Sequence, residues 1–169
     1  VGEGLHVLQK NRIGLEGFDI IATNLEEIQQ RIGADLRISQ EDYHSIRIFH
    51  GRPQWPVDGN DKTMIHELGI NSECCAFNKG CYVGQEIINR IDVKGLLNKK
   101  LHRMAIQGEA SVRDDLHMAS KVIGSLSSLS SNEGERFGLG IIKKGAWDTG
   151  TVLRLSSGGT ATVLPYSHS

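Results

Sequence analysis

The 169-residue chain lacks most of the features that assign a sequence to a special class of protein. No stretch approaches about 18 consecutive apolar residues, which excludes a transmembrane helix. The few cysteines, Cys74, Cys75 and Cys81, form no Cys-x-x-Cys pair and have no histidine at zinc-ligand spacing. Three thiols also fall short of the four ligands of a cluster, so we expect no stable iron–sulfur cluster in one chain. The simplest interpretation of this cysteine usage is an intracellular, reducing compartment.

The composition is that of a folded globular chain, with 38% hydrophobic and 23% charged residues. The length predicts one large or two small domains. The net charge is −1, but residues 79–103 carry six basic and two acidic side chains, a local charge of +4 that leaves −5 for the rest. This segment either attracts anions or is a solvated loop rich in lysine. RNA is the weaker candidate partner, because no aromatic residues are interleaved with the charges.

The run Lys79-Gly80-Cys81-Tyr82-Val83-Gly84-Gln85-Glu86 is the most informative segment. It places a thiol close to an ammonium group, which favours the reactive thiolate. Val83, Ile87 and Ile91 follow at helical spacing, so the run predicts a loop that brings Cys81 to the start of a helix. The alternative interpretation is that Cys81 is a small buried hydrophobe and that the glycines serve a turn.

Upstream, residues 5–22 predict two short strands around a turn near Asn11 and Arg12, with Phe18, Ile20 and Ile21 in the core. Asn24 predicts the cap of a helix over residues 25–32 that stops at Gly33. Ser39 and Asp42 predict a capping box for a second helix that ends at Gly51. We expect the buried stripe of this second helix to consist of Tyr43, Ile46, Phe49 and His50.

From Leu101 onward the pattern changes to short apolar runs separated by glycines. The runs span residues 101–106, 121–129, 137–142, 151–155 and 160–164. This spacing predicts a small antiparallel β-barrel. The expected fold class is therefore α+β, with an α+β domain over residues 1–98 and a β-barrel domain over residues 99–169.

The octet at 79–86, together with Arg90, Gly95 and the run Lys99-Lys100-Leu101, resembles the signature of the YgfZ-type folate-binding proteins. That family is related to the glycine-cleavage aminomethyltransferase and acts in assembly and repair of iron–sulfur proteins. Residues 12–19 resemble the glycine- and acid-rich strand of the same superfamily. Residues 45–53 resemble its Arg-containing helix end with the Gly-x-Pro that follows.

The resemblance implies a tetrahydrofolate-binding accessory factor in which Cys81 is the functional thiol, as a nucleophile or a transient ligand. Lys79 would lower the pKa of Cys81 or hold a folate carboxylate. Gln85 and Glu86 would bind the pterin, or equally would cap the helix and lock the loop. The residues implied in folate binding are Arg47, Glu67, Lys79, Tyr82, Gln85, Glu86, Arg90, Lys99 and Lys100.

Two other functions stay open at this point: a folate-dependent aminomethyl transferase, and a non-catalytic interaction domain. The expected partners are folate and iron–sulfur assembly proteins or client enzymes. The chain starts at Val1 in a strand-like segment, and family members are about twice as long. We therefore expect an amino-terminal half, or a partner chain, to supply part of the pocket. The expected location is the cytoplasm of a bacterium or, alternatively, the mitochondrial matrix.

Overall fold

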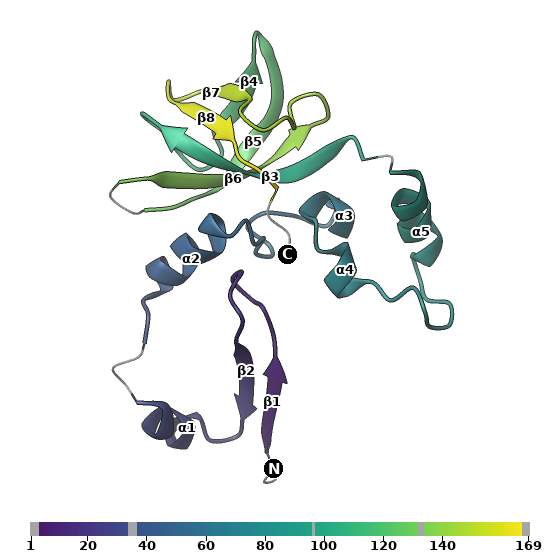
Figure 1. Ribbon diagram of the computed structural model, residues 1–169, viewed down its shortest axis with the longest axis vertical. Helices are drawn as coiled ribbons and strands as arrows, with labels where there is room; N and C mark the ends of the chain where they lie inside the picture. The colour runs from purple at the N-terminus through teal and green to yellow at the C-terminus, as the bar shows by residue number, and fades with distance from the viewer. Residues whose placement is uncertain (1–3, 34–36, 96, 132–133, 167–169) are drawn as a thin grey trace.

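The computed structural model describes residues 4–33, 37–95, 97–131 and 134–166. A β-barrel at one end of the molecule is followed by a layer of short helices, and a two-stranded hairpin with one helix extends to the other end (Figure 1). This arrangement confirms the predicted fold class of an antiparallel α+β part and a small barrel.

Six antiparallel strands close the barrel in the order β3-β6-β5-β4-β7-β8. They are β3 (Lys99–Gln107), β4 (Asp115–Met118), β5 (Lys121–Leu129), β6 (Arg136–Lys143), β7 (Val152–Leu155) and β8 (Thr160–Val163). The interior is filled by apolar side chains that are almost wholly buried, among them Met104, Leu116, Leu126, Ile142, Leu153 and Val163. The apolar runs predicted five of these strands. They did not predict β4, which is four residues long and contributes a single wholly buried side chain, Leu116.

The amino-terminal hairpin pairs β1 (Leu5–Gln9) with β2 (Phe18–Ala22), in a register that places Leu5 opposite Ala22. The expectation that its apolar residues form a core is wrong for two of the three, because Phe18 is 68% exposed and Ile21 is 58% exposed. The sheet has two strands among the described residues, so it offers these side chains little surface to pack against.

Two helices begin where their capping residues predict. Helix α1 (Leu25–Ile32) is capped by Asn24, whose side chain accepts a hydrogen bond from the amide of Glu27. Helix α2 (Gln40–Phe49) begins with a reciprocal capping box between Ser39 and Asp42. Both caps satisfy amide donors that the first turn of a helix leaves unpaired.

The buried face of α2 differs from the predicted stripe. Ser45, Arg47 and Ile48 are buried, whereas Phe49 is 46% exposed. Helix α2 packs against β5 and β6, and on this face Arg47 binds Asp58 of the following loop and Ser128 of β5. Tyr43, Ile46 and His50 of the predicted stripe are half-buried. A stripe chosen by hydrophobicity excludes an arginine, so it does not include Arg47.

Three further helices connect α2 to the barrel: α3 (Ile65–Leu68), α4 (Asn71–Cys74) and α5 (Gln85–Lys94). Helix α3 packs against β3, and α5 packs against α3 at the side of the molecule (Figure 1). Of the three residues predicted at helical spacing, Val83 precedes α5 and is fully exposed, Ile87 is 58% exposed, and Ile91 is half-buried. The half-buried positions are Gln85, Ile88 and Ile91. In the part of the chain that the structure describes, no helix is long and apolar enough to cross a membrane.

Candidate functional site

The octet forms an exposed loop that leads into α5. Cys81 is exposed, which is contrary to the alternative interpretation of a small buried hydrophobe. The Lys79 ammonium lies 5.0 Å from the centroid of the Tyr82 ring, a cation–π distance. The Tyr82 amide donates to the Gln85 side-chain oxygen at 3.3 Å, and the Gln85 amide donates to the Tyr82 carbonyl at 3.2 Å. The loop is thereby held in place around its thiol, with a basic side chain at its amino-terminal end.

Gln85 and Glu86 have local partners at the start of α5. Gln85 closes the turn that it shares with Tyr82, and Glu86 forms an i,i+4 ion pair with Arg90 at 2.9 Å. These contacts agree with the interpretation in which Gln85 and Glu86 cap the helix and lock the loop. Helix α5 starts at Gln85 after Gly84 in the left-handed conformation, so Cys81 lies ahead of the helix and not within its first turn.

Gly84 and Gly80 provide a matched test of this loop. Gly84 has a φ of +87°, which disfavours any side chain, whereas no positive φ occurs at Gly80, and a Cβ at either position meets no atom within 4 Å. We expect Gly84→Val to lower the free energy of unfolding by about 1–3 kcal/mol, the usual cost of backbone strain. Gly80→Val is the control and should change it by less than about 0.5 kcal/mol. Equal denaturation midpoints for the two variants in urea would contradict this account of the loop.

Two other residues implied in folate binding, Glu67 and Lys99, lie together between α3 and β3. Glu67 is 8% exposed, and its carboxylate accepts a hydrogen bond from the Met64 amide at 3.0 Å. The Lys99 ammonium lies 3.4 Å from the same carboxylate. Part of the basic segment is therefore engaged within the protein, since Arg90 also has an acidic partner.

Lys100 lies in a separate aromatic cluster on β3. Its ammonium sits 3.4 Å from the centroid of the Tyr166 ring. The His102 ring packs at centroid distances of 5.9 Å from Trp147 and 5.7 Å from Tyr166. Burial lowers the pKa of Lys100 and raises the pKa of Tyr166 to about 12. An anion that approaches Lys100 therefore meets a cation that is already partly desolvated.

His102 in this cluster makes the stability of the protein dependent on pH. Burial, and secondly the charge of Lys100, lower its pKa from 6.5 to about 4, and neither ring nitrogen has a hydrogen-bond partner. The unfolded chain takes up a proton below pH 6.5, whereas the folded protein resists protonation until about pH 4. Stability is therefore present above pH 6.5 and is lost as the pH falls toward 4, by up to about 3 kcal/mol at 1.4 kcal/mol per pKa unit.

We expect His102→Phe, which keeps a ring in the cluster, to remove most of this loss between pH 6.5 and 4. Thermal unfolding followed across that range measures it. The control is His117→Gln on β4, which should leave the pH dependence in place. The same slope in the His102 variant and the wild type would show that His102 is not its source.

Arg47 lies in a buried network between α2 and the barrel. Its guanidinium donates to the Asp58 carboxylate at 2.7 Å, to the Ser128 hydroxyl at 2.8 Å, and at 3.1 Å to the Arg52 carbonyl and to Nδ1 of His44. The Asp58 carboxylate also accepts from the hydroxyls of Ser127 at 2.5 Å and Ser128 at 2.6 Å. The exposure of the two charged side chains is 4% and 0%. Arg47 is thus separated from the octet loop, which lies beyond α4 on the other side of the helical layer (Figure 1).

A cavity beside the hairpin contains residues that sequence reasoning did not place in the site. It has a volume of about 460 Å³ and is lined by Lys10, Arg12, Phe18, Asp19, Tyr43 and neighbouring residues of the loop. Arg12 binds Oδ2 of Asp19 through Nε at 2.9 Å and Nη2 at 2.5 Å. These hydrogen bonds lower the pKa of Asp19, so the cavity carries a carboxylate that stays ionised. The sequence analysis had included Asp19 in the segment 12–19 that resembles the superfamily's strand. It did not identify Asp19 as a candidate ligand.

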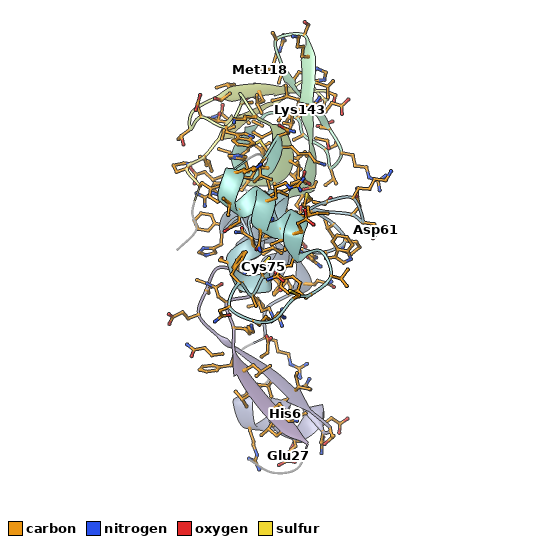
Figure 2. All side chains as sticks on the ribbon, turned by 90° about the vertical axis from the view of Figure 1, so that its right-hand side faces the viewer. His6, Glu27, Asp61, Cys75, Met118 and Lys143 are labelled. Carbon is orange, nitrogen blue, oxygen red and sulfur yellow. The ribbon has the colours of Figure 1, made fainter. Side chains whose placement is uncertain are left out.

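The hairpin loop is fixed to the end of α2 and to α4. Gly14 has a φ of +89°, and a Cβ there would lie 2.1 Å from Cβ of His50, so only glycine fits. Arg52 donates to the Asn11 carbonyl at 3.0 Å and binds Glu73 of α4 in a bidentate ion pair at 2.5 and 2.7 Å. The two upstream segments that carry the resemblance therefore meet in space. Cys75, which follows α4, lies between the barrel and the hairpin along the long axis of the molecule (Figure 2).

Comparison with known proteins identifies the fold but not a family, because no family model matches the sequence. The chain is 27% identical over 128 residues to a chloroplastic "putative transferase" of Arabidopsis thaliana, an alignment that covers 73% of this chain and 29% of that protein. It superposes on the glycine cleavage system aminomethyltransferase T of Bartonella henselae with a TM-score of 0.78 at 13% identity, covering 98% of this chain and 49% of the other. The fold is therefore aminomethyltransferase-like, and the chain spans less than half of either protein.

Proposed function

We propose that the protein is a YgfZ-type, tetrahydrofolate-binding accessory factor that supports the assembly or repair of iron–sulfur proteins. The observation that carries the proposal is an exposed Cys81, held in the octet loop on an aminomethyltransferase-like fold. Cys81 acts as the functional thiol, and Lys79, two residues earlier, supplies a positive charge in the same loop.

The cavity beside the hairpin is the binding place for the pterin ring. A pterin carries adjacent N–H donors on one edge, and an ionised carboxylate accepts such a pair of hydrogen bonds well. Asp19 is a carboxylate of this kind, oriented by Arg12, and Phe18 and Tyr43 offer aromatic surface in the same cavity. The role of Gln85 and Glu86 is then to hold the octet loop, in line with their local partners.

The carboxylate tail of the folate is bound by the basic segment. Residues 79–103 carry a local charge of +4, and Lys99 and Lys100 stand at the start of β3. Each further glutamyl unit adds a negative charge, so longer tails gain more from this field. Arg47 does not take part in this interaction, because its guanidinium is buried with Asp58.

A further polypeptide completes the folate pocket. The chain spans 49% of the aminomethyltransferase on which it superposes, and the apolar side chains of Phe18 and Ile21 are exposed on the hairpin. An amino-terminal half of the same protein, or a partner chain, covers these side chains and supplies the remaining contacts to the ligand.

The second candidate function is a folate-dependent aminomethyl transferase. The fold of the solved transferase and the transferase name of the Arabidopsis protein favour it. Formation of methylene-tetrahydrofolate from an aminomethyl donor by the intact protein would decide for this alternative. No turnover, together with folate binding, would decide for the accessory factor.

Calorimetry of the full-length protein with mono- and polyglutamyl tetrahydrofolate tests the proposed ligand. We expect Asp19→Asn to weaken both ligands by about tenfold or more, since hydrogen bonds to a charged group contribute about 1.5–3 kcal/mol. We expect the longer tail to bind more tightly at low salt, and Lys99→Ala/Lys100→Ala to remove most of that difference.

The matched control for charge is Lys121→Ala/Lys144→Ala, two exposed lysines of the barrel. This variant should preserve the preference for the longer tail. Equal affinities for the two ligands would mean that the basic segment binds a client protein or only keeps the protein soluble. An unchanged affinity in Asp19→Asn would show that the pterin does not bind in the hairpin cavity.

A further inference from the structure

One carboxylate oxygen of Asp19 is open to a ligand in the hairpin cavity. Both hydrogen bonds from Arg12 go to Oδ2, and Oδ1 has no partner among the residues that the structure describes. Oδ1 is not a buried atom, and the Asp19 side chain is 24% exposed. Arg12 therefore orients the carboxylate without blocking the oxygen that a ligand would reach.

Arg12 belongs to the loop that joins β1 to β2, and its side chain does little to fix its own position. The loop over residues 10–17 supplies most of the lining of the cavity. The Arg12 side chain is 65% exposed, so few neighbours pack against it. The point from which Arg12 reaches Asp19 is therefore set by the backbone of the loop.

Arg52 binds this backbone from outside the hairpin. Its Nη2 donates at 3.0 Å to the carbonyl of Asn11, the carbonyl of the peptide bond that joins Asn11 to Arg12. The close contact of Gly14 with His50 limits how near the loop comes to α2, whereas this hydrogen bond orients a peptide group. Arg52 does not line the cavity, so it acts on a bound molecule only through the loop.

Glu73 of α4 holds the Arg52 guanidinium in place. The ion pair is bidentate, with N–O distances of 2.5 and 2.7 Å, and the Arg52 side chain is 14% exposed. Two parallel hydrogen bonds fix the plane of a guanidinium as well as its position. Nη2 binds both Glu73 and the Asn11 carbonyl, so the direction of that carbonyl follows from the geometry of the ion pair.

We propose that Arg52 is a positioning residue for the ligand of the hairpin cavity. Anchored by Glu73, it fixes the peptide bond from which Arg12 reaches the Asp19 carboxylate. This role rests on the proposed function, in which Asp19 binds the pterin. It also makes the cavity depend on α4, a helix that contributes no residue to its lining.

The Arg12–Asp19 pair can be observed without a ligand. Nε of Arg12 donates to Asp19 at 2.9 Å, and a hydrogen-bonded N–H exchanges with water more slowly than a free one. We expect Arg52→Met to speed this exchange in the isotope-labelled full-length protein near neutral pH. Arg31→Met removes an exposed ion pair of α1 and is the matched control, which should leave the exchange unchanged.

Calorimetry of the full-length protein with monoglutamyl tetrahydrofolate measures the consequence for the ligand. We expect Arg52→Met to weaken binding by about tenfold, close to the effect of Asp19→Asn. Residues that act through one contact are not additive, so Arg52→Met/Asp19→Asn should bind no more weakly than Asp19→Asn alone. A purely structural role of Arg52 would instead make the two losses multiply.

Glu73→Ala is a second variant that does not depend on how Arg52→Met folds, because the Glu73 side chain is 48% exposed. It should change both measurements in the same direction. The proposal is overturned if Asp19→Asn weakens binding and Arg52→Met does not, if the losses multiply in the double variant, or if the Arg12 exchange is unchanged. If the wild type binds no tetrahydrofolate, the proposed function fails, whereas faster Arg12 exchange in Arg52→Met still supports the positioning of Arg12.

Discussion

Replacing Asp58 by alanine is expected to lower the free energy of unfolding by about 3–5 kcal/mol. The variant leaves the Arg47 guanidinium, whose side chain is 4% exposed, without its counter-charge. It also removes the acceptor of the Ser127 and Ser128 hydroxyls and of the Gln54 amide. The network ties α2 and the following loop to β5, so its loss should loosen the contact between the helical layer and the barrel.

Chemical denaturation measures this effect, and Asp61→Ala is the matched control, because Asp61 is exposed in the same loop. The control should change stability by less than about 0.5 kcal/mol. The double variant Arg47→Met/Asp58→Leu should be less destabilised than Asp58→Ala, because it leaves no unpaired charge. A loss below about 1 kcal/mol for Asp58→Ala would show that the pair contributes little to the fold.

Alkylation at neutral pH is expected to modify Cys81 first and Cys75 last. Cys81 is exposed, whereas burial, and then the neighbouring Cys74 and Asp92, raise the pKa of Cys75. A raised pKa lowers the fraction of Cys75 that is present as the reactive thiolate at neutral pH. Cys74 is exposed but follows Glu73, whereas Cys81 has Lys79 two residues earlier, so we expect Cys81 to react faster than Cys74.

Single-cysteine variants with the other two positions changed to serine measure the three rates separately. Faster labelling of Cys74 or Cys75 than of Cys81 would contradict the assignment of the functional thiol. Lys79→Gln should slow the labelling of Cys81 and leave that of Cys74 unchanged. In cells that lack the protein, wild type and Cys74→Ser should restore the activity of iron–sulfur enzymes, whereas Cys81→Ser should not.

Local signals in the sequence predicted the elements whose ends depend on a single side chain. The Asn24 cap and the Ser39–Asp42 capping box lie at the starts of α1 and α2, because these side chains bind amides within the first turn. The barrel was predictable because its strands are short apolar runs separated by glycines. In each of these cases, the information lies within a few residues of the element.

The parts that were not predicted depend on contacts between distant residues. The buried face of α2 is determined by Arg47, which is compatible with burial only because Asp58 lies 11 residues away and Ser128 lies 81 residues away. The position of β4 depends on its pairing with β5 and β7. The exposure of Phe18 and Ile21 follows from a sheet with two strands among the described residues, which hydrophobicity alone does not reveal.

In the candidate site, too, local features were predictable and contacts between distant residues were not. The octet forms one loop, in which Lys79 contacts the Tyr82 ring and Tyr82 binds Gln85. The sequence did not reveal that Lys99 lies 3.4 Å from the Glu67 carboxylate, or that Arg47 belongs to a buried network. Asp19 was quoted within a strand, but its place in a cavity with Tyr43 appears only when the hairpin loop contacts the end of α2.

Closure of the barrel has a consequence for aggregation. Its strands pair in a ring that presents no edge for another chain to join, whereas β1 and β2 are both edge strands in the described sheet. Val7 and Leu8 on β1 are about half exposed, at 53% and 47%, in a segment of high β-propensity. Intermolecular strand pairing should therefore begin at the hairpin, and any polypeptide that pairs with β1 or β2 also protects the protein from forming fibrils.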